Sequence, residues 1–198
     1  MRYINQRNYP DMLYVTRTDP ENPRHERGKT TTVKSSGCGL CAAIMVADRL
    51  LPTYEFELED AIALSYAVEA NRAAGTSYKK FAPAFAEKMG LKLEATKNIE
   101  DLRRCLRTGG AAVLLVGGDR EGHVGLFTHG GHYMTAISEE PDGRFAILDP
   151  SYYEGKFEEE GREGKVELKN GIIVLCDGDT LEEESKMKET PYYLFWRK

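Results

Sequence analysis

The spacing of hydrophobic residues divides the chain into an early part that favours helices and a later part that favours strands. Residues 42–51 are apolar on nearly every face, and Pro52 follows them. A helix that is apolar all round is a buried one, so this run predicts a buried helix that begins at Cys38. The preceding residues 8–36 are polar and contain three prolines, which predicts a long loop.

Two more helices are expected after the buried one. Apolar residues at helical spacing form a stripe over residues 58–73, and Gly75 follows as the expected stop. A further stripe runs from Phe81 to Met89. There Pro83 fits the first turn of a helix and Gly90 fits its C-terminal cap.

The later part of the chain alternates short apolar runs with turn signals, a pattern typical of strands. Asn98 can cap one more helix over residues 98–106, which follows a strand at Leu91–Ala95. The other expected strands are residues 111–116, 133–138, 145–148, 172–176 and 192–196, with a turn at 140–143. Helices first and mostly antiparallel strands second predict an α+β fold.

Composition is that of an ordinary globular protein. The 198 residues, 41% hydrophobic and 30% charged, predict a single domain over residues 1–198. A net charge of −5 leaves no electrostatic footprint for nucleic acid, and the apolar runs are too short to span a bilayer. We therefore expect neither nucleic acid nor a membrane as partner. The acidic runs 158–160 and 182–184 are expected to be solvated loops.

The N-terminus and the cysteines bear on where the protein works. No apolar segment typical of a signal peptide follows Met1, so we expect a cytoplasmic protein if Met1 is native and a secreted one if a signal peptide was trimmed. Four cysteines are too few for a disulfide scaffold, which favours reduced thiols. Cys105 and Cys176 fit apolar core positions. Nothing in these patterns sets the oligomeric state.

Cys38 is the first candidate for chemistry. It opens the buried helix, and the N-terminal end of a helix presents unpaired backbone N–H groups that favour a thiolate. Gly37 and Gly39 flank it and would let a substrate backbone approach closely. The alternative is that Cys38 is a small buried hydrophobic residue, the usual place of a lone cysteine.

His132 and Asp149 form the second candidate. His132 follows two glycines at the head of a predicted strand, and Asp149 ends the next strand. In a regular hairpin that turns at Glu140–Pro141, the two residues lie directly opposite each other, with Cβ atoms about 5 Å apart. A carboxylate there can accept the imidazole N–H and leave the other ring nitrogen facing a thiol. Taken alone, Asp149-Pro150 is a common way to start a turn.

A reactive cysteine, a glycine-flanked histidine and a carboxylate, in that order, are the parts of a cysteine hydrolase. With them the chain resembles the papain-like cysteine peptidases, in particular the bacterial peptidases that process bacteriocin leaders. The resemblance is carried by Asn5-Gln6 with Tyr9, by Ser36-Gly37-Cys38-Gly39 running into Ala43-Ile44-Met45-Val46, and by residues 126–133 followed by Asp149-Pro150. It covers roughly residues 3–155 and is weak over the C-terminal strands of residues 156–198.

The resemblance implies a papain-like fold and a peptidase or amidase that hydrolyses a peptide or related amide without a cofactor or metal. Acyl transfer to an amine in place of water would use the same residues. Cys38 would be the nucleophile, His132 the general base and then acid, and Asp149 the residue that orients it. Gln6 would be the oxyanion-hole donor. Gly37, Gly39 and Gly131 would contact the substrate. Leu40-Cys41 departs from the family, which commonly has a proline and a small hydroxyl residue there, and Gln6 lies unusually far before Cys38.

Three other interpretations stay open at this stage. Cys38-Gly39-Leu40-Cys41 is also a C-x-x-C, the signature of thioredoxin-like redox proteins, which needs a βαβ context. Otherwise Cys41 is a core residue. His123, His129 and His132 could hold a zinc ion if their side chains converge, whereas His25 lies in the polar segment and carries no signal. The chain could also be a non-catalytic module that binds peptides in a papain-like groove.

Overall fold

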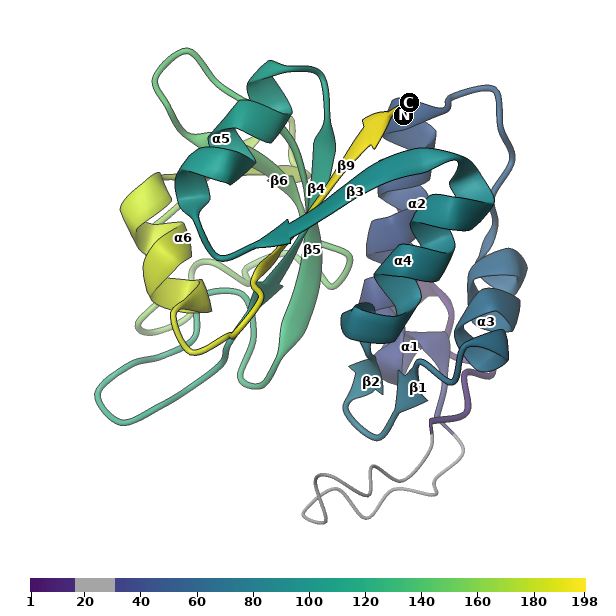
Figure 1. Cartoon of the computed structure of the whole chain (residues 1–198). Coiled ribbons are helices and arrows are strands. Elements are labelled where there is room, and N and C mark those ends of the chain that lie inside the picture. The colour runs from purple at the N-terminus through teal and green to yellow at the C-terminus, as the bar shows by residue number, and fades with distance from the viewer. Residues whose placement is uncertain (17–30) are drawn as a thin grey trace.

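A computed structural model describes residues 1–16 and 31–198, so His25 and residues 17–30 of the expected loop lie outside the described residues. A seven-stranded antiparallel sheet forms the centre of the molecule (Figure 1). Its strands, in spatial order, are β3 (Leu91–Thr96), β9 (Tyr192–Arg197), β4 (Ala111–Val116), β5 (His132–Glu139), β6 (Phe145–Leu148), β8 (Ile173–Cys176) and β7 (Glu167–Lys169). The α+β prediction is confirmed.

Helices cover both faces of this sheet (Figure 1). On one face α2 (Cys38–Leu50) packs on β4 and β5, and α4 (Tyr78–Met89) packs on β3. On the other face α5 (Ile99–Arg107) contacts β5 and β9, and α6 (Gly178–Ser185) contacts β4. Each face has its own hydrophobic core, because alternate residues of a strand point to opposite sides.

The buried helix α2 is held in place at its N-terminal half by polar contacts as well as by packing. Every residue from Gly39 to Ala47 is buried, as its apolar sequence predicts. The Thr135 hydroxyl donates to the carbonyl of Ala42 at 3.0 Å. Tyr78 donates to the carbonyl of Gly39 at 2.6 Å and stacks on Tyr133 with ring centroids 4.4 Å apart. The start of α2 is therefore fixed against both the sheet and α4.

The second predicted helix is too long. Helix α3 (Leu58–Ala67) stops before the predicted end, and Glu69 has a positive φ of 54°. The chain then forms a small hairpin of β1 (Asn71–Arg72) and β2 (Gly75–Thr76). Asn71 is buried and donates to the carbonyl of Val15, a contact with a distant segment that helical spacing does not report.

Several predicted helix ends and loops differ from the structure. Pro83 is exposed in the second turn of α4, because that helix starts at Tyr78, while Gly90 does cap it with φ 63°. Residues 182–184 belong to α6, and the carboxylate of Glu184 is buried. The stretch expected as one loop ends in the short helix α1 (Val33–Ser36), and the short helix η1 (Gln6–Asn8) reaches its first residue. Within the described ranges, no helix is long and apolar enough to cross a membrane.

Candidate active site

Cys38 lies at the first position of α2, directly after Gly37, which ends α1. It is partly exposed, whereas the other three cysteines are buried, and all four are free thiols. The position follows from the sequence, because the apolar run starts just after the two glycines. A thiol here faces the positive end of the helix dipole.

His132 and Asp149 come together, although not in the predicted register. His132 Nε2 lies 2.7 Å from Asp149 Oδ1, and both side chains are buried. The two residues are not directly opposite each other, because the hairpin turns around Asp142 instead of at Glu140–Pro141, so that Glu139 pairs with Phe145. A bulge at Ala136–Ser138 then shifts the pairing by one residue, and Thr135 is paired with Leu148. Continuing this register places Asp149 diagonal to His132 on the same face of the sheet, within reach of the imidazole.

Asp149 accepts hydrogen bonds on both carboxylate oxygens. Besides His132, Oδ1 accepts the backbone N–H of Ser151 at 2.8 Å. Oδ2 lies 2.5 Å from the Nζ atom of Lys156, whose side chain is also buried. A buried carboxylate with these partners stays ionised and fixed in orientation.

No pattern in the sequence marks Lys156 as a site residue. It stands in the charged stretch Gly155-Lys156-Phe157-Glu158, which reads as solvated surface. Its ammonium lies 5.9 Å from the centre of the Tyr153 ring and 5.8 Å from that of Phe157. No local pattern distinguishes this lysine from its exposed neighbours, because its burial depends on Asp149 and on the fold of residues 149–157.

The electrostatics of the group favour a thiolate beside an imidazolium. Burial raises the pKa of Cys38, but hydrogen bonding to His132 and to the backbone of Tyr133 and Gly39 outweighs it, so the thiol pKa is lowered. Burial lowers the pKa of His132, whereas Asp149 and Cys38 raise it, with a net rise to about 9. Asp149 keeps a depressed pKa because its interactions with His132 and Lys156 outweigh burial.

Gln6 lies between the segment that precedes Cys38 and the segment that follows Asp149. Its backbone N–H donates to the carbonyl of Pro150 at 2.7 Å, and its side-chain Nε2 donates to the carbonyl of Lys34 at 2.6 Å. Its Oε1 is buried and accepts no hydrogen bond from the described residues. The long insertion before Cys38 thus returns to Gln6 in space, and its role as oxyanion donor stays a prediction.

The three glycines expected to contact substrate lie in different surroundings. A Cβ atom on Gly37 would meet Val33 at 2.6 Å, and one on Gly39 would meet Tyr78 at 2.9 Å. Close packing inside the protein therefore explains why glycine is needed at both positions, without a contact to substrate. Gly131 is exposed and lines the cavity beside Cys38.

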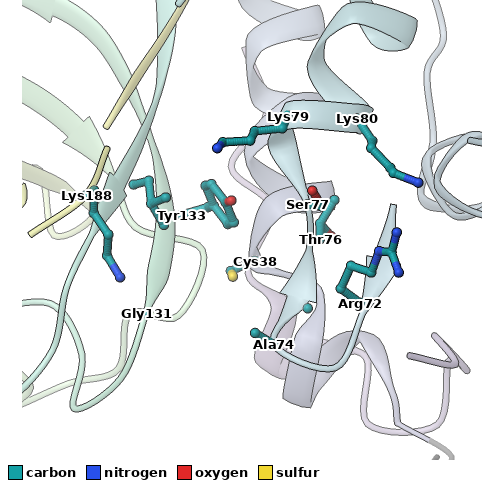
Figure 2. Close-up of a pocket in the computed structure, with 12 residues that line it drawn as sticks. Cys38, Arg72, Ala74, Thr76, Ser77, Lys79, Lys80, Gly131, Tyr133 and Lys188 are labelled. Atoms are coloured by element: carbon teal, nitrogen blue, oxygen red, sulfur yellow. The ribbon is translucent and has the colours of Figure 1, made fainter. Parts of the chain in front are cut away.

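That cavity has a volume of about 460 Å³ and opens over Cys38. One wall consists of the β1–β2 hairpin and the start of α4, and the other contains Gly131, Tyr133 and Lys188 (Figure 2). The sulfur atom lies between the two walls (Figure 2). A chain segment that enters the cavity would therefore reach the thiol.

The three histidines proposed as a zinc site do not converge. Each lies beside a different carboxylate, since His123 Nε2 is 2.8 Å from Glu184 and His129 Nδ1 is 2.8 Å from Asp119, whereas His132 binds Asp149. Within residues 1–16 and 31–198, no group of three or more histidine, cysteine or acidic side chains could hold a metal ion.

Comparisons with known proteins agree with this architecture. No family model and no curated protein matches the chain. Among solved structures, a candidate C39-like peptidase from Bacillus anthracis superposes with a TM-score of 0.52 at 13% identity, covering 82% of this chain and 88% of that one. The peptidase domain of Streptococcus ComA, a bifunctional ABC transporter of a quorum-sensing pathway, gives 0.53 at 12% identity, covering 83% and 93%.

At sequence identities this low, the comparisons show a similar fold, and any statement about chemistry must come from the residues of this chain. The fold argues against a thioredoxin-like redox site at Cys38 and Cys41, because such a site requires a βαβ unit with parallel strands. Every strand pairing in the described sheet is antiparallel. Cys41 is fully buried in the core, as expected for a packing residue. The chain has the papain-like cysteine peptidase fold in the form found in C39-like peptidases.

Proposed function

We propose that this protein is a cysteine peptidase or amidase that cleaves a peptide or related amide through a thioester on Cys38. The observation that carries the proposal is the buried imidazole of His132, which binds Asp149 through Nε2 at 2.7 Å and lowers the pKa of the cavity-facing Cys38 thiol. With Nε2 engaged, Nδ1 is the nitrogen left to exchange a proton with the substrate and the thiol.

In the first half of the reaction, the Cys38 thiolate attacks the carbonyl carbon of the scissile amide and a C–S bond forms. The C–N bond then breaks, and the leaving amine takes the proton that His132 carried. Asp149 remains ionised and holds the ring in the orientation that this transfer needs.

In the second half, neutral His132 accepts a proton from water, and the resulting hydroxide attacks the thioester. The C–S bond then breaks with its electron pair staying on sulfur, the carboxylic acid product leaves, and the thiolate–imidazolium pair forms again. Gln6, together with the backbone N–H of Cys38, is the proposed donor to the oxyanion in both halves. Lys156 is a proposed positioning residue, because its ammonium acts on the reaction through Asp149 alone.

The decisive experiment incubates wild type and Cys38→Ala with a pool of acetylated peptides, supplied once with free C-termini and once amidated, and identifies the cut sites by mass spectrometry. We expect cleavage by wild type, none by Cys38→Ala, and an acyl adduct on Cys38 when the best peptide is supplied as an activated ester. A wild-type protein that binds peptides but neither cleaves them nor forms the adduct would instead be a non-catalytic binding module.

A further inference from the structure

The cavity over Cys38 is positively charged, in contrast to the rest of the protein. Four of its lining residues are cations, namely Arg72, Lys79, Lys80 and Lys188, and none is acidic. The chain as a whole carries a net charge of −5. A cleft lined by one sign of charge concentrates ligands of the opposite sign.

Two of these cations are paired with glutamates. Lys79 Nζ lies 2.7 Å from Glu189, and Lys80 Nζ lies 3.8 Å from Glu69. No side-chain hydrogen bond or ion pair within residues 1–16 and 31–198 involves Arg72 or Lys188, so their charges are available to a ligand.

Lys188 is the better placed of the two. A Cβ atom built on Gly131 would lie 3.7 Å from Lys188 Nζ, and Gly131 directly precedes His132. The side chain is half-buried, and this burial lowers its pKa without an acidic partner to oppose the effect. The protein thus holds a partly desolvated ammonium beside the reacting groups, where an incoming carboxylate would compensate the lost hydration.

We propose that this site binds a substrate carboxylate next to the scissile amide, with Lys188 as the residue that contacts it and Arg72 adding attraction from the opposite wall. The inference rests on the proposed function, since it names the substrate class of the same site. The carboxylate has two sources in a peptide: the side chain of an aspartate or glutamate, or the C-terminal carboxylate.

The test uses the peptides that wild type cleaves best in the pool described above. Each is resynthesised in two matched pairs. One pair exchanges glutamate for glutamine beside the cut site with the C-terminus amidated, and the other exchanges a free C-terminus for an amide without acidic side chains. We expect kcat/KM to fall about ten- to a hundredfold on loss of the carboxylate in one of the pairs, which identifies its source.

Variants of Lys188 assign the effect to this residue. Lys188→Met should abolish the difference within that pair, and Lys188→Glu should reverse it in favour of a peptide with lysine at the same position. Lys186→Glu is the matched control, because Lys186 is exposed, pairs with Glu183 and does not line this cavity. Its preference should equal that of wild type.

The outcomes separate the two proposals. Cleavage by wild type with less than a twofold difference in both pairs overturns the carboxylate site and leaves the peptidase intact. Preservation of the preference in Lys188→Glu overturns the assignment to Lys188. Failure to cleave any peptide, together with failure to form the Cys38 adduct, overturns the proposed function and the inference with it.

Discussion

The ammonium of Lys156 lies 2.5 Å from Asp149 Oδ2, while His132 occupies the other oxygen of the same carboxylate. The three side chains are buried, so the carboxylate is balanced by one cation on each side. Removing one member of such a buried arrangement leaves a charge without compensation.

Lys156→Met should therefore lower the free energy of unfolding by about 3 kcal/mol or more. Turnover should fall roughly tenfold or more, because the carboxylate that orients His132 loses one of its fixed partners. The pKa of Asp149 should rise without this cation, so activity at acid pH should disappear at a higher pH than in wild type. Denaturant unfolding and a pH profile of kcat/KM measure the two effects.

The control for this variant is Lys165→Met, which removes an exposed lysine from the same segment. It should leave both measurements unchanged. An unaltered pH profile in Lys156→Met would show that this lysine only stabilises the fold.

Cys38 should react far faster with iodoacetamide at mildly acidic pH than the other cysteines. Its pKa is lowered, whereas burial raises the pKa of Cys41, of Cys105 (to about 12) and of Cys176. Peptide mapping by mass spectrometry gives the rate at each site. His132→Ala should shift labelling of Cys38 to higher pH, and equal rates at all sites in folded wild type would contradict the proposed thiolate.

The pH profile of kcat/KM should be bell-shaped. Activity should rise as pH rises through the lowered pKa of Cys38, because the nucleophile must lose its proton. It should fall as pH rises through about 9, because His132 must keep its proton for the leaving amine. In Asp149→Asn the falling limb should move to lower pH, since the Asp149 charge is what raises the pKa of His132.

Loss of the side chains themselves extends this test. Asp149→Ala should lower the free energy of unfolding, because it leaves Lys156 buried without its carboxylate, and should reduce turnover in the protein that remains folded. His132→Ala should reduce turnover further, because that change removes the proton acceptor. Retention of full activity in His132→Ala would rule out the proposed catalytic group.

Gln6→Ala should reduce turnover about a hundredfold, the usual effect of losing one preorganised oxyanion donor. The alkylation rate of Cys38 should stay at the wild-type value, since its interaction with His132 is untouched. Arg7→Ala is the control, because Arg7 is exposed in the same short helix. Wild-type turnover in Gln6→Ala would mean that another group, such as Asn5 or Asn8, donates instead.

Cys41→Ser separates hydrolysis from redox chemistry. Cys41 is fully buried, so the hydroxyl should lower the free energy of unfolding by about 1–3 kcal/mol while most peptidase activity remains. Cys38→Ser should abolish the activity. If wild type reduced disulfides, cleaved no amide, and lost the reductase activity in both variants, the proposed mechanism would be wrong.

Local patterns predicted those parts of the fold that depend on local interactions. The bounds of β4 and β6 agree with the apolar runs, and α2 begins at Cys38 as predicted. The end of α3 and the whole of α6 were missed, because contacts with distant segments decide them. Glu184, for example, is buried because it accepts the backbone N–H of Leu126 and contacts His123.

The candidate site divides in the same way. Cys38, His132 and Asp149 could be proposed because glycines, a helix start and a hairpin mark their places in the sequence. The geometry of the last pair depends on a bulge at Ala136–Ser138 that no residue signals. No sequence pattern around Lys156 predicts that its side chain is buried beside Asp149.

The place of β9 in the sheet has a consequence for how the protein is made. This strand pairs with both β3 and β4, although its residues 192–197 follow β4 by a long stretch of chain. During synthesis β3 and β4 have no strand between them until residues 192–197 leave the ribosome. Pairings so distant in sequence are slow to form. A nascent chain that already contains Cys38, His132 and Asp149 therefore still lacks the centre of its sheet, and peptidase activity should appear only after these late residues are released.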